Sequence, residues 1–216
     1  MKVTLLNVTP NAEEHIVEVA RVSSSRKNKK DKPEGLLRYL VQHKHWSPFE
    51  HGHATFEIET SKAIGIQLIR HRSFAFQEFS QRYQDVNRLG DIFEPIELRA
   101  QCEDNRQSST EVINPQLPVE GGSLYASDSI STFLNSAHKL YNQLLEVGVA
   151  RETARMVLPL ATTTKIHMTG SIRSWIHFLE LRDDGHAQKE IQIVAKEIKK
   201  HFVKQFPVIS NALGYV

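Results

Sequence analysis

The sequence lacks the features that would place the protein outside the cytoplasm. It has a single cysteine, Cys102, among 216 residues, which excludes a disulfide within the chain. The segment Met1 to Val8 lacks the long apolar core of a signal peptide, and no apolar run approaches the roughly 18 residues that a membrane-spanning helix needs. We therefore expect a soluble protein in the reducing cytoplasm, with no membrane partner.

Several motifs of nucleotide-binding and hydrolytic enzymes are also missing. The chain has no G-x-G-x-x-G turn, which excludes a Rossmann dinucleotide site. No G-x-S-x-G elbow surrounds Ser80, so we interpret Ser80 as a hydrogen-bonding ligand group and not as an acyl-transfer nucleophile. Histidines crowd His43, His45, His51 and His53, but neither H-E-x-x-H nor a Cys/His pattern is present, and we predict no metal site.

The charge balance is nearly even, with a formal net charge of +2. The whole-molecule field therefore does not point to nucleic acid. A non-catalytic nucleic-acid-binding protein that uses the basic loop Arg26 to Lys32 is the rival hypothesis, and it predicts affinity with a steep salt dependence. The near-neutral charge and the lack of interleaved surface aromatics disfavour it.

A phosphohydrolase is a third hypothesis, but the sequence lacks the carboxylate or metal-ligand spacing of such enzymes.

The apolar periodicity predicts a series of strands and helices within one domain spanning residues 1–216. The predicted strands are 3–8, 53–60 and 162–169, and the predicted helices are 12–22, one entered near Pro33, 61–69, 130–145, 151–158, 171–181 and 187–202. Ser61 is the expected cap of the helix that leads to Arg70. No period survives in the polar stretch 99–122, which we interpret as a surface excursion.

The most informative stretch spans residues 70–83 and reads R-H-R-S-F-A-F-Q-E-F-S-Q-R-Y. Guanidinium groups suit phosphate and carboxylate oxygens, so Arg70, Arg72 and Arg82 indicate a site for an anionic, phosphorylated ligand. The alternative is a solvated charged face. The chain offers further arginines on later helices, where we expect Arg151 to be an exposed charge and Arg155 to belong to the site.

This stretch resembles the R-H-R-x7-S signature of the flavin-dependent thymidylate synthases. Other segments resemble the same family in the same order, namely R-V-S at 21–23, H-W-S-P-F-E-H at 45–51, R-E-T-A-R-M-V-L-P-L from Arg151 and L-R-D-D-G-H-A-Q-K-E-I-Q from Leu181. The resemblance covers most of the chain and leaves out the polar stretch 99–122. Three positions depart from common family residues, Ala75, Gln77 and His177, and they bear on the flavin pocket and not on the reaction class.

The resemblance implies a reductive methylation of dUMP to dTMP without a covalent enzyme nucleophile. Methylenetetrahydrofolate would supply the carbon, and NADPH would supply a hydride through bound FAD. It also implies an α+β fold with a small antiparallel sheet packed with helices, and a homotetramer whose active sites are shared between subunits.

The resemblance further assigns roles to individual residues. Arg182 matches the catalytic position, where it would stabilise charge on the pyrimidine. His45 matches a histidine near the flavin. The positions implied for the flavin are Ser23, Ser47, Arg70, His71, Arg72, Glu78, Arg173 and His177. Those implied for dUMP are Gln67, Arg70, Glu78, Ser80, Gln81, Arg82, Arg155 and Arg182.

Overall fold

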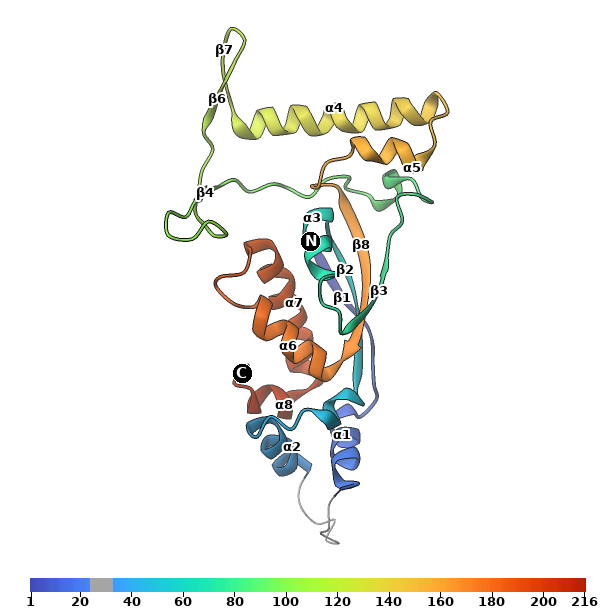
Figure 1. Cartoon of the computed structure of the whole chain (residues 1–216), viewed down its shortest axis with the longest axis vertical. Coiled ribbons are helices and arrows are strands. Elements are labelled where there is room, and N and C mark those ends of the chain that lie inside the picture. Colours follow the sequence, from blue (N-terminus) through green and yellow to red (C-terminus); the bar gives the residue numbers. More distant parts are fainter. Residues whose placement is uncertain (24–32) are drawn as a thin grey trace. The chain divides into compact units, whose positions relative to one another are not determined.

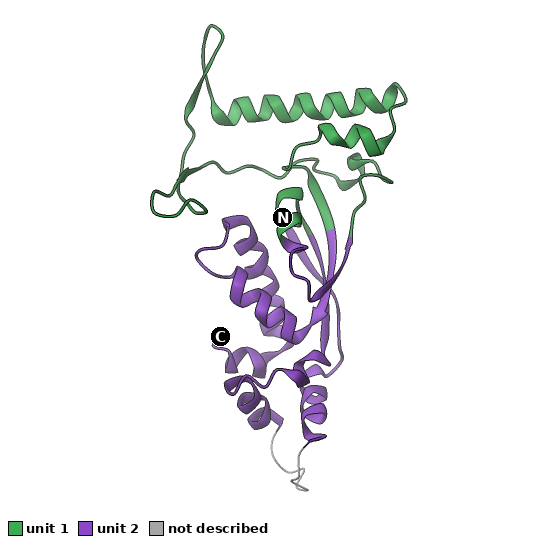
Figure 2. Ribbon diagram, viewed as in Figure 1, with its two compact units in different colours: residues 1, 59–67, 78–165 green, residues 2–58, 68–77, 166–216 purple. Residues whose placement is uncertain are grey.

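The computed structural model describes residues 1–23 and 33–216 (Figure 1). The basic stretch Arg26 to Lys32, predicted as a loop, lies outside the described residues. The chain divides into two compact units, which are described separately (Figure 2). Unit 1 comprises residues 1, 59–67 and 78–165, and unit 2 comprises residues 2–58, 68–77 and 166–216.

A four-stranded sheet has the strand order β1-β2-β8-β3. Its strands are β1 (Lys2–Val8), β2 (His53–Ser61), β8 (Thr163–Ser171) and β3 (Phe74–Glu78). The alternation seen in the sequence of β2 reflects one buried face, because Ala54, Phe56 and Ile58 are buried. Together with the helices, this sheet confirms the expected α+β fold.

Strand β3 was not among the elements predicted from the sequence. The alternating pattern that would reveal this strand in the sequence is short, since only Phe74 and Phe76 alternate with the more exposed Ala75 and Gln77. The same letters form part of the arginine-rich motif. A segment can therefore carry site residues and also be a regular strand.

The helices of unit 2 begin with α1 (Ala12–Arg21), α2 (Pro33–Gln42) and the 3-10 helix η1 (Ser47–Glu50), and end with α6 (Ile172–Arg182), α7 (Lys189–Gln205) and α8 (Pro207–Ala212). Helices α6 and α7 lie side by side (Figure 1). Trp175 of α6 joins the helix to β2, because its Nε1 donates to the carbonyl of Ala54 at 3.0 Å. Its ring also meets Phe56 and Phe74 edge-on, with centroids 4.8 and 4.6 Å away. These contacts fix α6 against the sheet.

Gly170 in β8 makes room for the Phe74 ring. A Cβ at Gly170 would lie 2.4 Å from Cδ1 of Phe74, which is closer than two carbon atoms can approach. Phe74 therefore lies directly over the backbone of β8. This placement brings its ring to Trp175 and Phe178 of α6.

Unit 1 contains α3 (Lys62–Leu68) except for its last residue, the 3-10 helices η2 (Val86–Leu89) and η3 (Arg155–Val157), and the helices α4 (Ala126–Glu146) and α5 (Arg151–Ala154). Ser61 caps α3 as predicted, since its Oγ accepts from the backbone N–H of Ile64 at 3.4 Å. Val86, Tyr141 and Ala154 form a buried apolar cluster. The single helix predicted over residues 151–158 is instead a short α-helix followed by a 3-10 turn before Pro159.

The polar stretch 99–122 holds much of two small antiparallel pairs. Strand β4 (Arg99–Gln101) pairs with β5 (Ser109–Val112), and β6 (Gln116–Val119) pairs with β7 (Gly122–Tyr125). Every residue from Ser109 to Tyr125 is exposed, so no alternation of polar and apolar residues marks these strands in the sequence. Among the described helices, none combines the length and the apolar character that a bilayer crossing requires.

Helix α4 is amphipathic as predicted, but much of its apolar stripe is open. Ala137 and Tyr141 are buried, whereas Phe133 is 60% exposed and Leu140 is 45% exposed. The neighbouring hairpin of β6 and β7 adds more exposed apolar side chains, namely Leu117, Val119, Leu124 and Tyr125. We call this set the α4 patch.

Candidate active site

The residues predicted for the site fall into both units. Unit 2 holds Ser23, Ser47, Arg70, His71, Arg72, Arg173, His177 and Arg182, and unit 1 holds Gln67, Glu78, Ser80, Gln81, Arg82 and Arg155. The groups in each unit are described in turn.

Arg182 and His71 form a direct contact in unit 2. Arg182 is the last residue of α6, and its Nε donates to Nε2 of His71 at 2.9 Å. The His71 side chain is buried, with 9% of the residue exposed. Phe178 and Phe74 meet its ring edge-on, with centroids 5.0 and 6.2 Å away. The predicted catalytic arginine is thus held by a histidine of the arginine-rich motif.

The surroundings of His71 favour its neutral form. Burial, followed by the electrostatic effects of Arg182 and His177, lowers the pKa of His71 from its ordinary value of 6.5 to about 4. Since Nε2 accepts the bond from Arg182, the neutral ring carries its proton on Nδ1. Burial also lowers the pKa of Arg182, but a guanidinium remains charged at neutral pH.

A cavity of about 450 Å³ opens beside α6 in unit 2. It contains Arg173 and His177, which lie four residues apart and so share one face of the helix. Its walls also include Trp46, Glu50, Ser73, Ser174, Ile176 and Glu180. The cavity combines cationic, acidic and aromatic groups, a composition that suits a polar ligand with an aromatic ring.

Glu50 fixes the first turn of α6 on one side of this cavity. Its Oε1 accepts from Nη1 of Arg173 at 2.9 Å, and its Oε2 accepts from Oγ of Ser171 at 2.5 Å. Ser171 is the N-cap of α6 and accepts in turn from the backbone N–H of Ser174 at 3.2 Å. Neither Glu50 nor Trp46 was predicted as a site residue, although both lie in the segment H-W-S-P-F-E-H that carries part of the resemblance.

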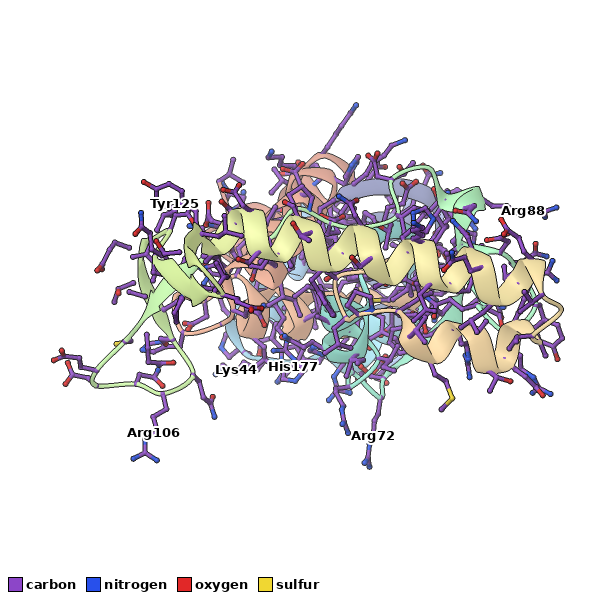
Figure 3. The ribbon with its side chains drawn as sticks, turned by 90° about the horizontal axis from the view of Figure 1, so that it is seen from above. Lys44, Arg72, Arg88, Arg106, Tyr125 and His177 are labelled. Carbon is purple, nitrogen blue, oxygen red and sulfur yellow. The ribbon has the colours of Figure 1, made fainter. Side chains whose placement is uncertain are left out.

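The other predicted residues of unit 2 lie on the surface. Ser23, Ser47, Arg70 and Arg72 are exposed, and the guanidinium groups of both arginines have no hydrogen-bond or ion-pair partner in the part of the chain that the structure describes. Figure 3 shows the Arg72 side chain extending away from the ribbon. Such open guanidinium groups are available to an anion.

His45 lies in a small exposed aromatic cluster of unit 2. Tyr39 stacks on His43 at a centroid distance of 4.0 Å, and both rings lie within 6 Å of the His45 ring, at 5.8 and 5.9 Å. No group of three or more metal-binding side chains occurs among residues 1–23 and 33–216.

Glu78 is the best-connected predicted residue of unit 1. Its Oε1 accepts from Nζ of Lys62 and from Oγ1 of Thr164, each at 2.8 Å. Lys62 was not predicted as a site residue, and its only signal is its place directly after the helix cap Ser61. The two donors hold the Glu78 carboxylate at the end of β3.

Glu152 brings two predicted arginines together in unit 1. Arg82 donates from Nε to its carboxylate at 3.2 Å, and Arg155 donates from Nε to its backbone carbonyl at 3.3 Å. Both arginines are exposed, as is Arg151, which agrees with the interpretation of Arg151 as a surface charge. Both guanidinium groups thus contact the same residue, Glu152, and are open to solvent.

Ser80 and Gln81 precede Arg82 in a tight turn. The carbonyl of Ser80 accepts from the backbone N–H groups of Tyr83 and Gln84, at 3.1 and 2.9 Å. Gln81 is 6% exposed, and its Nε2 is buried without a hydrogen-bond partner in the described residues. A buried donor without an acceptor is costly, so this amide fits a position that a ligand oxygen completes.

Comparisons with known proteins show the family to which the chain belongs. The family model described as "Thymidylate synthase complementing protein" matches residues 4–208. A "Probable flavin-dependent thymidylate synthase" of Paramecium bursaria Chlorella virus 1 is 43% identical over 206 residues, which are 95% of this chain and 92% of the relative. The "Flavin-dependent thymidylate synthase" of Synechocystis sp. is 38% identical over 200 residues, covering 93% and 88%. That of Thermosipho melanesiensis is 37% identical over 192 residues, covering 88% and 81%. These findings confirm the resemblance, and the chain belongs to the thymidylate synthase complementing protein family.

Proposed function

We propose that this protein is a flavin-dependent thymidylate synthase that converts dUMP to dTMP, with methylenetetrahydrofolate as carbon donor and NADPH as reductant. Family membership and the names of the relatives support this reaction. The structural observation that supports this proposal most directly is the fixed guanidinium of Arg182, whose Nε donates a hydrogen bond to Nε2 of His71. Its terminal nitrogens have no other partner in the described residues and can serve a substrate.

We propose that Arg82 and Arg155 bind the phosphate of dUMP. The Arg82–Glu152 ion pair is exposed, with 59% and 58% of the two side chains accessible, and such pairs are worth about 1 kcal/mol or less. A phosphate can therefore displace the Glu152 carboxylate at little cost. The remaining nucleotide-binding positions in this proposal are Gln67, Arg70, Glu78, Ser80, Gln81 and Arg182.

The residues of unit 2 fit FAD. Arg173 and His177 can meet its phosphates or carbonyls, and Trp46 supplies an aromatic surface in the same cavity. When bound, FAD takes up a hydride from NADPH and makes it available for reduction of the transferred carbon. The other residues proposed to hold it are Ser23, Ser47, Arg70, His71, Arg72 and Glu78.

Arg182 is the proposed catalytic residue. As C5 of the pyrimidine becomes nucleophilic, negative charge develops on the carbonyl edge of the ring, and a fixed guanidinium stabilises that charge. No protein nucleophile is needed in this scheme. The hydroxyl of Ser80 has no histidine or carboxylate partner among the described residues, in agreement with its role as a binding group.

We also propose that the protein acts as a cytoplasmic homotetramer. The α4 patch supports self-association, because a group of large exposed apolar side chains on neighbouring elements is a common mark of an interaction surface. Closed symmetric assemblies are the usual form of self-association in soluble proteins.

Absorption spectroscopy and product analysis of the purified protein test the proposed reaction. The protein should be yellow or become yellow on loading with FAD, and it should oxidise NADPH while forming dTMP only when dUMP and methylenetetrahydrofolate are present. A colourless protein that cannot be loaded with FAD would overturn the proposal. Tight filter binding of nucleic acid with a steep salt dependence would instead support a nucleic-acid-binding protein.

A further inference from the structure

We infer that His71 is a positioning residue for Arg182, whose guanidinium it orients through the hydrogen bond from Nε of Arg182 to Nε2 of His71. The inference rests on the proposed function, in which Arg182 acts on the pyrimidine. It gives His71 a role that does not depend on contact with the flavin.

The bond restricts the arginine in a specific way. The guanidinium is planar, so fixing the direction of its Nε–H also fixes the plane of the two terminal nitrogens. The length of 2.9 Å is that of a well-formed hydrogen bond. Arg182 thereby keeps both terminal nitrogens free to face a substrate in one preset orientation.

His71 is itself held on several sides. Its backbone N–H donates to the carbonyl of Leu68 at 3.1 Å, and its carbonyl accepts from the backbone N–H of Phe74 at 3.3 Å. The rings of Phe74 and Phe178 meet the imidazole edge-on. A buried ring in such a setting has little freedom to turn, so Nε2 is a fixed acceptor.

A neutral acceptor has an advantage over a carboxylate here. A carboxylate would bind Arg182 more strongly but would offset the positive charge that the substrate needs. The neighbouring carboxylate of Asp183 is bound elsewhere, because its Oδ2 accepts from Nζ of Lys199 at 2.9 Å. His71 orients Arg182 and leaves its full charge available.

The charged groups that face His71 keep the imidazole in this role. Burial disfavours a positive charge on the ring, and Arg182 and His177, both on α6, act in the same direction. A protonated imidazole would carry N–H on both nitrogens and could not accept the bond from Arg182. Orientation therefore requires the neutral form with the proton on Nδ1.

Two variants separate positioning from packing. His71→Gln keeps an acceptor on a flexible chain and loses the ring, whereas His71→Phe keeps a ring and loses the acceptor. We expect kcat to fall roughly 10- to 100-fold in His71→Phe, as when an orienting partner is removed at metal sites, and to be largely restored in His71→Gln. A packing role predicts the opposite order, with His71→Phe the more active variant.

The Arg182→Ala background separates positioning from direct flavin contact. If His71 acts through Arg182, adding His71→Phe to Arg182→Ala lowers kcat no further at saturating FAD, whatever it does to FAD affinity. A further fall in kcat at saturating FAD would show that His71 affects turnover by a route other than Arg182, and the inference would be wrong.

An NMR measurement on the full chain without FAD or substrate tests the bond itself. With 15N-labelled arginine, the Nε–H signal of Arg182 is the one lost in Arg182→Lys. We expect it to exchange slowly with water in the wild type and in His71→Gln, and rapidly in His71→Phe. An unchanged signal in His71→Phe would refute the bond even if the protein is an active thymidylate synthase. A protected signal in a protein that makes no dTMP would refute only the proposed function.

Discussion

Glu50 binds Arg173 through Oε1 and the helix cap Ser171 through Oε2, at 2.9 and 2.5 Å. This carboxylate thus fixes the position of Arg173, which faces the cavity, and the first turn of α6, which carries Arg173.

We expect Glu50→Gln to weaken FAD binding by several-fold, because a neutral amide holds the guanidinium of Arg173 less firmly. Quenching of FAD fluorescence measures the affinity. Glu180→Gln is the matched control, since Glu180 lines the same cavity and makes no hydrogen bond or ion pair with Arg173 in the described structure. An equal loss in both variants would contradict a specific role of Glu50.

Replacing the arginine at the end of α6 tests the proposed chemistry. We expect Arg182→Ala to lower kcat by roughly two to three orders of magnitude, as when one donor to a developing negative charge is removed. Steady-state formation of dTMP measures the effect. Normal turnover with only weaker dUMP binding would show that Arg182 binds the substrate without stabilising the transition state.

Replacing either member of the Arg82–Glu152 pair tests the proposed phosphate site, because the two substitutions should affect dUMP affinity differently. Arg82→Ala should weaken dUMP binding by about 1.5 to 3 kcal/mol, the range for hydrogen bonds to charged groups. Glu152→Gln should leave dUMP binding unchanged or strengthen it, because it removes the anion that competes for Arg82. Titration calorimetry with dUMP measures both. Equal weakening in the two variants would mean that Glu152 belongs to the binding site and is not a competitor.

The α4 patch predicts how assembly can be disrupted. Phe133→Asp places a charge in the exposed apolar stripe, and we expect it to give a smaller species than the wild type. Analytical ultracentrifugation measures the mass. Asn135→Asp, at an exposed polar position of the same helix, should leave the mass unchanged. If Phe133→Asp retains the wild-type mass, the patch is not an interface between copies.

The lowered pKa of His71 predicts that the free energy of unfolding decreases at acid pH. Its pKa in the folded protein is about 4, below the ordinary value of 6.5, so the unfolded chain binds this proton first as the pH falls. Folding is therefore destabilised between about pH 6.5 and 4, by at most about 1.4 kcal/mol per pH unit for one proton. Urea unfolding across this range should show a shallower pH slope in His71→Gln than in the wild type. Equal slopes would mean that His71 has the same pKa in both states.

The sequence predicted well those elements that have one buried face. The strand at 53–60 and the helix at 171–181 were visible because their buried side chains recur with the period of each element. These are Ala54, Phe56 and Ile58 in the strand, and Ile172, Trp175, Ile176 and Leu179 in the helix. The strands β5, β6 and β7 were not visible, because all their residues are exposed and no period is imposed on them. Strand β3 was not predicted, because its residues lie within the arginine-rich motif 70–83, which we interpreted as a binding segment.

The identity of the site residues could be predicted better than their partners. Motif resemblance named Arg182 and His71, and it also named Arg82 and Arg155. It could not show that Arg182 binds His71, because that bond joins residues 111 positions apart. In the same way, only the structure shows that Glu50 binds Arg173 and that Glu152 binds Arg82.

Gly170 shows how a residue without a side chain constrains its neighbours. A methyl group at this position would collide with the ring of Phe74, which forms one wall around His71. Substitutions at Gly170 and Phe74 are therefore coupled, and a larger residue at the first is tolerated only with a smaller one at the second. In directed evolution of this enzyme, the two positions should be randomised together, because single changes at Gly170 displace Phe74.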